Sequence, residues 1–428
     1  MNLKLLEAKM RRIKIPAVII SMMLVFAILF NFTGCVLKAQ AADLMEGIEA
    51  EDLGEVPPLL NKDAAIATDF AIRLFRACNE SGKNTLISPL SVMIALAMTA
   101  NGAVGQTKTQ METVLGMSTD DLNRYFRSYM NALPSSEKVK FSLANSIWFT
   151  SDERFTVNKS FLQTNANYYG ADAYKVPFDN TTLKAINDWV KDKTDGMIPE
   201  ILDKIPADAI MYLVNALAFE AEWANTYANE QITKQEFTQS DGTKQTVDFM
   251  FSNTERYYLE DEKATGFIKN YVGHYAFVAM LPKNGVTVDE YISYLDGQKI
   301  NNLLSNPVIT HIVTLMPKFE TEYSTEMSEV LKAMGMQIAF SGGSADFSNL
   351  GRSSAGNIYI GRVIHKTFIS VAEKGTKAGA ATVIEMRDGA AYEPMNPKEV
   401  YLTRPFVYML IDTETNVPFF IGTLNSVK

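Results

Sequence analysis

The chain has 428 residues, 47% of them hydrophobic, so it can bury a large core. Its net charge of −9 speaks against a nucleic-acid partner, because phosphate binding requires a basic surface. No repeat, Pro- or Gly-rich linker or charge block divides residues 60–428. We therefore expect a single domain over residues 62–428.

The N-terminus has the features of an export signal. Basic residues precede an apolar run from Ala17 to Phe30, which is too short for a comfortable membrane span. The sequence Phe-Thr-Gly-Cys at 32–35 then resembles a bacterial lipobox, in which Cys35 would carry a lipid anchor. A rival cleavage site at 39–41 would instead release a soluble protein. We expect a signal peptide over 1–34, a tether over 35–61, and an exported, extracellular or cell-surface protein.

Cys78 is the second of two cysteines in the chain. If Cys35 is lipidated or removed, Cys78 has no partner for an intramolecular disulfide. It lies on an apolar helical face, so we expect an inert core thiol.

Helices are predicted first along the chain. Apolar residues recur at helical spacing over 64–80. A second helix is expected to begin at Ser88 and Pro89, with Ser88 as its N-terminal cap and Pro89 in its first position. Two amphipathic helices follow, over 106–117 and 119–133.

Strands and helices alternate after these helices, and strands dominate later. We expect strands over 141–149 and 171–178, helices over 158–169 and 181–195, and a strand over 209–223 covered on both faces. Short strands at hairpin spacing over 237–281 include a turn at Asp241 and Gly242. The remaining predictions are helices over 288–295 and 327–334 and strands over 312–319, 404–411 and 418–422. This order indicates an α+β fold.

Residues 365–392 predict one buried strand that leads directly into a second, unpaired strand. From Thr376 onward the residues able to face a core have even numbers, whereas Lys377, Glu385 and Arg387 have odd numbers. This period of two is typical of a strand. Glycines and alanines lower its β-propensity, so the segment is suited to moving into a sheet later.

The stretch from Val371 to Thr382 resembles the hinge of an inhibitory serpin; the alternative is an Ala- and Gly-rich surface linker. Stretches around Ser88, Asn215 and Trp223, 345–348, 404–411 and 418–422 also resemble serpin motifs, in family order across residues 62–428. The resemblance implies helices around a large central mixed sheet, two smaller sheets, and an exposed reactive-centre loop over about 373–400. The hinge residues would be Glu373, Gly375, Thr376, Ala378, Ala380, Ala381 and Thr382.

The resemblance implies that Trp223 lies where the moving strand first enters the sheet, that His365 lies at the base of the strand leading to the hinge, and that Asn215 and Ser88 belong to the same group of entry-point and core residues. The family usually has Lys-Gly where this chain has Glu220 and Ala221, which affects local detail.

Enzymatic motifs are absent from the sequence. None of its three histidines belongs to a recognisable catalytic or metal-binding motif, and no nucleotide-binding loop is present. We expect no catalytic residue, no metal and no cofactor, and we interpret His365 as a hydrogen-bonded core histidine.

The resemblance implies a monomeric, irreversible suicide-substrate inhibitor that forms a covalent 1:1 complex with a serine or cysteine endopeptidase. Family spacing places the cleaved bond between Gly389 and Ala390, with Arg387 and Asp388 as the alternative. A non-inhibitory binding or storage protein is the second hypothesis. It would be expected to have a charged, bulky or proline residue on the buried hinge face, which here is formed by Thr376, Ala378, Ala380 and Thr382.

Overall fold

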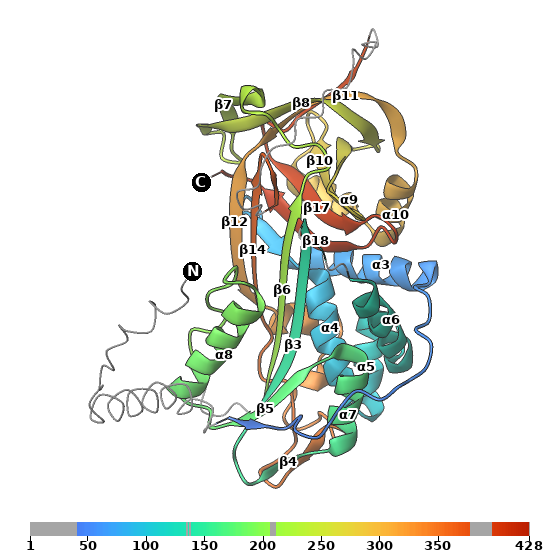
Figure 1. The fold of residues 1–428 in the computed structure, drawn as a ribbon, viewed down its shortest axis with the longest axis vertical. Helices are drawn as coiled ribbons and strands as arrows, with labels where there is room; N and C mark the ends of the chain where they lie inside the picture. The colour runs from blue at the N-terminus through green and yellow to red at the C-terminus, as the bar shows by residue number, and fades with distance from the viewer. Residues whose placement is uncertain (1–40, 134–135, 137, 206–210, 377–395, 428) are drawn as a thin grey trace, which may run out of the picture. The chain divides into compact units, whose positions relative to one another are not determined.

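The computed structural model describes residues 41–133, 136, 138–205, 211–376 and 396–427. The chain divides into two units, and nearly all described residues belong to the second, Asp43–Lys428 (Figure 1). The expected signal peptide and Cys35 lie outside the described residues. Within the described ranges, no helix combines the length and apolar composition needed to cross a membrane.

Four helices lie close together near the start of the second unit. They are α3 (Asn61–Cys78), α4 (Pro89–Ala100), α5 (Gly105–Leu115) and α6 (Thr119–Ala132), and a short strand, β2 (Thr85–Ile87), precedes α4. The predicted start of α4 is confirmed: Ser88 Oγ accepts a hydrogen bond from the Ser91 N–H, and Pro89 is the first helical residue. Because α4 is buried along almost its whole length, it is a central helix of the fold.

One mixed sheet, called the first sheet below, contains the candidate site. Its strands from β5 onward are, in order, β5 (Asp172–Val176), β3 (Val139–Thr150), β6 (Met211–Glu222), β15 (Gly375–Thr376), β14 (Ile364–Ala372) and β12 (Phe319–Glu326). Strands β3 and β5 are parallel, whereas β3 and β6 are antiparallel. Strand β6 is covered on both faces, as predicted, since both Ala218 and Phe219 are buried.

A second sheet runs through strands contributed mainly by the later half of the chain. Its order is β16 (Lys398–Tyr401), β11 (Val308–Pro317), β8 (Lys244–Glu260), β9 (Ala264–Asn270), β10 (Tyr275–Pro282), β17 (Phe406–Asp412), β18 (Pro418–Leu424) and β2, with β7 (Ile232–Thr238) on β8. It is larger than expected, because the 17-residue β8 pairs with β7, β11 and β9 and so joins two groups of strands. The third sheet has two strands, β4 (Phe155–Val157) and β13 (Gly351–Ser353). The α+β class is confirmed.

The remaining described elements are mostly short. They are β1 (Ala42–Asp43), α7 (Lys159–Tyr169), α8 (Asn180–Lys193), η1 (Asn229–Gln231), α9 (Val288–Tyr294), α10 (Gly297–Ser305), α11 (Ser328–Ala333) and η2 (Ile338–Phe340). Helix α10 was not predicted, because it has nine residues and begins with a poor helix former, Gly297. The predicted turn is present, with Gly242 at a positive φ of 83°.

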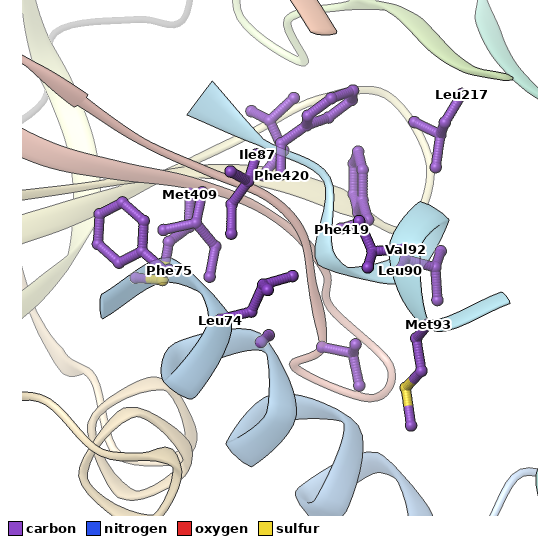
Figure 2. Packing of buried hydrophobic residues seen from close by; sticks show 14 of the residues in the cluster. Leu74, Phe75, Ile87, Leu90, Val92, Met93, Leu217, Met409, Phe419 and Phe420 are labelled. Carbon is purple, nitrogen blue, oxygen red and sulfur yellow. The ribbon is translucent and has the colours of Figure 1, made fainter. Parts of the chain in front are cut away.

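Helices α3 and α4 pack against the C-terminal strands to form a continuous apolar core (Figure 2). The contributing side chains include Leu74 and Phe75 of α3, Ile87 of β2, Leu90, Val92 and Met93 of α4, Met409 of β17, and Phe419 and Phe420 of β18. Leu217 of β6 belongs to the same core. Helix α4 therefore packs against β18 of the second sheet and β6 of the first sheet, which matters for the site.

Candidate functional site

The start of the predicted hinge already lies in the first sheet. Gly375 pairs with Glu222 of β6 and with Ala372 of β14, and Thr376 pairs with Ala221 and Val371 on the same two strands. The prediction that this second strand is unpaired is therefore wrong for its first two residues. The error arises because the sequence pattern shows a low β-propensity but not that two strands separate far enough to receive the segment.

Gly375 occupies a position that only glycine fits. Its φ is +154°, and a Cβ at this position would lie 1.9 Å from the backbone oxygen of Ala221. A larger residue would have to push the hinge away from β6, so Gly375 permits the close approach of the two backbones.

Thr376 points into the protein interior. Its side chain is 2% exposed, and its hydroxyl lies 2.5 Å from the hydroxyl of Tyr271. The Tyr271 ring stacks on the Trp223 ring with centroids 4.2 Å apart and planes 9° apart. Thr376, the first of the even-numbered residues predicted to face the core, thus does so.

The segment after β6, residues 223–227, donates hydrogen bonds to the backbone carbonyl groups of the hinge. The backbone N–H of Trp223 donates to Lys374 O at 2.9 Å, and its indole Nε1–H donates to Ala372 O at 2.8 Å. The N–H of Tyr227 donates to Glu373 O at 3.0 Å. Trp223, expected at this point from the resemblance, therefore contacts the hinge directly.

The Glu373 side chain pairs with a cation on the neighbouring strand. Its carboxylate lies 2.7 Å from Lys318 Nζ, and this lysine lowers the pKa of Glu373. Both side chains are about one-third exposed, so the pair orients the hinge more than it stabilises the fold.

Beyond these two residues, no described strand lies between β6 and β14, and this interval of the first sheet is called the opening (Figure 1). Both strands are antiparallel to β15, so they run parallel to each other. Among the described strands, β6 otherwise pairs with β3, and β14 otherwise pairs with β12. The backbone edges that face each other across this opening are where a longer β15 would bind.

The N-terminus of α4 contacts both sides of the opening. Ser88 donates its N–H to Nε2 of His365 on β14 at 3.0 Å. Ser91 donates its hydroxyl to Asn215 Oδ1 on β6, and Asn215 in turn donates to Asn145 of β3. The predicted core residues Ser88, Asn215 and His365 thus lie around one helix end, and α4 links the two strands that flank the opening.

His365 acts as a neutral hydrogen-bond acceptor. It is 5% exposed, and burial lowers its pKa to about 4. The imidazole is therefore uncharged at neutral pH, which leaves Nε2 able to accept the Ser88 N–H.

Several predicted site residues lie outside the described residues. These are the later hinge positions Ala378, Ala380, Ala381 and Thr382 and the candidate cleavage positions Arg387, Asp388, Gly389 and Ala390. The chain is described again from residue 396, and β16 begins at Lys398, inside the expected loop range. Strand β16 pairs in parallel with β11, so both ends of the loop are attached to sheets.

Sequence reasoning missed several residues that surround the hinge. Tyr271, Tyr227, Lys318 and Lys269 all contact it or the segment that holds it. No local period marks them, because each comes from a different element and meets the hinge only in the folded chain. Cys78 behaves as expected: it is buried, and burial raises the pKa of its thiol to about 12.

The fold and this site define a class of α+β protein. In this class a large mixed sheet holds the first residues of a loop, here β15, between two of its strands. A family model described as "Serpin (serine protease inhibitor)" matches residues 65–427. The chain belongs to the serpin family, many of whose members inhibit proteases.

Two solved structures of one relative differ in their similarity to this chain. A crystal structure of the thermophilic serpin Tengpin in the native state is 48% identical, with a TM-score of 0.86, and covers 91% of this chain and 100% of that chain. The latent state of Tengpin is 45% identical with a TM-score of 0.77, and covers 87% and 100%. The backbone described here is therefore more similar to the native than to the latent arrangement.

A curated relative carries an inhibitor's name. The leukocyte elastase inhibitor of Xenopus laevis is 30% identical over 382 residues, which cover 85% of this chain and 99% of that protein. The similarity therefore extends over nearly the whole relative.

Proposed function

We propose that this protein is an irreversible suicide-substrate inhibitor of serine endopeptidases and of cysteine endopeptidases that form the same acyl intermediate. The observation that carries the proposal is the position of β15. Two hinge residues already pair with both β6 and β14, and the opening beyond them can receive more of the same strand. Family membership supports the same function.

The chemistry is supplied by the protease. Its serine hydroxyl or cysteine thiol attacks the carbonyl carbon of the scissile bond and forms an ester or thioester as the C–N bond breaks. The amine on the C-terminal side takes up a proton and leaves as a new N-terminus. The N-terminal part of the loop stays bonded to the protease and remains continuous with β14.

Insertion of the freed strand supplies the driving force. A strand that fills the opening would add roughly a dozen backbone hydrogen bonds at about 1 kcal/mol each. Strand addition of this kind and the release of stored strain are general properties of serpin reactive loops. The attached protease is carried along, and its oxyanion hole is distorted. Because that hole contributes a factor of about 100 to 1,000 in rate, hydrolysis of the acyl bond stalls.

The scissile bond is proposed to lie between Gly389 and Ala390, within the window 387–391. Arg387 would suit a trypsin-like protease, and Ala390 or Ala391 an elastase- or subtilisin-like one; Tyr392, one residue beyond the window, would suit a chymotrypsin-like one. The loop up to Pro405 is longer than is usual for the family, so the alternative bond after Arg387 is part of the proposal.

The proposal includes three further properties. The protein is exported, it is monomeric, and it forms a covalent 1:1 complex with its target protease. The N-terminal signal supports export, and the Cys at position 35 supports a lipid anchor. Expression in a bacterial host with and without Cys35→Ser would test the anchor, since only the unmodified sequence should enter the detergent phase.

Incubation with trypsin-, elastase-, subtilisin- and chymotrypsin-like proteases tests the proposal. We expect one class to form a complex that survives denaturing electrophoresis, and mass spectrometry of the released peptide to identify a bond within 387–391. Cleavage by every protease without a stable complex would reject inhibition by trapping and would favour the binding or storage hypothesis. A cut before Glu385 or after Glu393 would reject the proposed window.

A further inference from the structure

An ion pair lies fully buried beneath the hinge. Lys269 of β9 and Glu255 of β8 approach to 2.7 Å, with side chains only 2% and 9% exposed. Ser252 Oγ also donates a hydrogen bond to Glu255. A buried pair of this kind is costly to desolvate, and well-packed apolar residues of similar volume often stabilise a fold equally well. Stability alone therefore does not account for it.

The lysine contacts the segment 223–227 at three places. Its Nζ lies 4.4 Å from the ring centroid of Tyr227 and 5.4 Å from that of Trp223. The same Nζ donates to the backbone oxygen of Asn225 at 3.1 Å. Cation–π contacts are strongest where the cation is desolvated, as it is here. One ammonium group thus fixes both ends and the middle of this segment, while Glu255 fixes the ammonium group.

This segment is the one that holds the hinge. Trp223 and Tyr227 donate the three hydrogen bonds to the carbonyl groups of residues 372–374. Trp223 also stacks on Tyr271, whose hydroxyl meets Thr376. The contacts therefore continue without a gap from Lys269, through Trp223 and Tyr227, to the hinge residues that are already in the sheet.

We infer that Lys269, held by Glu255, is a positioning residue that keeps Gly375 and Thr376 of the hinge paired in the first sheet of the intact protein. Without the cation, the segment 223–227 is released, the hinge leaves the sheet more often, and insertion starts from a less advanced state. The consequence for protease trapping rests on the proposed function, whereas the effect on hinge pairing does not depend on it.

The test compares three variants with the unmodified protein. Lys269→Met removes the cation but leaves Glu255 unpaired. The double variant Lys269→Met with Glu255→Leu removes both charges, so it is expected to retain fold stability while still lacking the contacts to Tyr227 and Trp223. The control is Arg124→Met, which also leaves a buried carboxylate without its partner, because Arg124 pairs at 2.8 Å with Asp63, whose side chain is 5% exposed. The Arg124–Asp63 pair joins α6 to α3, and neither helix belongs to the hinge or to the segment 223–227.

Hydrogen exchange followed by mass spectrometry reports on the hinge without any protease. We expect peptides over 221–227 and 372–376 to exchange about tenfold faster in both Lys269 variants, and at the unmodified rate in Arg124→Met. An unchanged hinge rate in the double variant, or an equal acceleration in Arg124→Met, would overturn the inference. If Lys269→Met does not fold, the double variant decides the matter.

Trapping provides the second readout. Relative to the unmodified protein, we expect each Lys269 variant to consume at least about threefold more inhibitor per protease trapped. Faster exchange with unchanged consumption would overturn the link to trapping. If the unmodified protein traps no protease, the proposed function fails, and the exchange result still supports or overturns the positioning role.

Discussion

The hydroxyl groups of Thr376 and Tyr271 meet at 2.5 Å inside the protein, where both residues are almost fully buried. Tyr271 belongs to the segment between β9 and β10, whereas Thr376 is the last described residue of the hinge. The contact means that the intact protein has already completed the first step of strand insertion. Further insertion would then extend an existing strand rather than begin a new one.

Thr376→Arg is expected to convert the inhibitor into a substrate. A guanidinium at this site would be buried beside Tyr271 without a counter-ion, at a cost of several kcal/mol, so the hinge would stay outside the sheet. Because trapping requires insertion to outrun deacylation, the loop should be cleaved at the same bond without a stable complex on a denaturing gel. The matched control is Lys377→Glu. Lys377 is the next residue along the chain and belongs to the odd-numbered set predicted to face solvent, so this variant should trap protease normally. Stoichiometric trapping by Thr376→Arg would contradict the assignment of the buried face.

Cleavage of the loop is expected to raise the thermal midpoint sharply. Among the described residues, the facing edges of β6 and β14 share the two residues of β15. Filling the opening adds roughly a dozen hydrogen bonds at about 1 kcal/mol each, so the cleaved form should unfold at a higher temperature and more slowly. Calorimetry of intact and loop-cleaved protein measures this difference. Identical midpoints would argue against an inhibitory serpin.

The pairing of β15 predicts the register of the inserted strand. Continued from Gly375 and Thr376, it places residue 381 opposite Lys366 of β14, with both side chains on the solvent face. A disulfide between Ala381→Cys and Lys366→Cys should therefore form after loop cleavage and not before it. Ala381→Cys with Ser370→Cys is the control, since four residues of offset separate the Cα atoms by about 13 Å, too far for a disulfide.

This cross-linking experiment is feasible because Cys78 does not interfere. Its thiol is buried, and its pKa is raised to about 12, so it is a poor nucleophile for exchange. Cys35 is replaced by Ser in all variants. Oxidised gels before and after cleavage give the result, and a bridge in the control pair would show that the register shifts by four residues.

His365 is expected to make stability depend on pH. Its folded pKa of about 4 lies below the ordinary value of 6.5, so the unfolded chain binds the proton more tightly. Stability is therefore fully present above about pH 6.5 and is lost as the pH falls towards 4, by about 2 kcal/mol at pH 5. Denaturant midpoints at pH 7 and pH 5 measure the loss. In His365→Gln, which can still accept the Ser88 N–H but does not titrate, the difference should shrink; an equal difference would assign the pH dependence to other groups.

Much of the fold could be predicted because its signals are local. The cap at Ser88, the first-turn Pro89 and the apolar run of β6 depend on neighbours within one helical turn or along one strand. Helix α10 was missed because nine residues beginning with Gly297 carry only a weak local signal. The second sheet was expected to be smaller because nothing in the residues of β8 shows that the strand continues from one group of partners to the next.

The candidate site could be predicted only in part. The alternation that begins at Thr376 indicates a face, and the structure places that residue in the core. The pairing of Gly375 and Thr376 depends instead on the distance between β6 and β14, which is set by packing elsewhere in the fold. Tyr227, Tyr271 and Lys269 were missed for the same reason, since each approaches the hinge from another element.

The sequence by itself determined the order of helices and strands, the family resemblance, and the small residues of the hinge, because these depend on side-chain type and on period along the chain. Only the tertiary structure decided that the strand is already started, that the N-terminus of α4 links Asn215 to His365, and that a buried cation lies beneath Trp223. Backbone pairing and ion-pair burial depend on how distant segments pack together. No local pattern of residues encodes those distances.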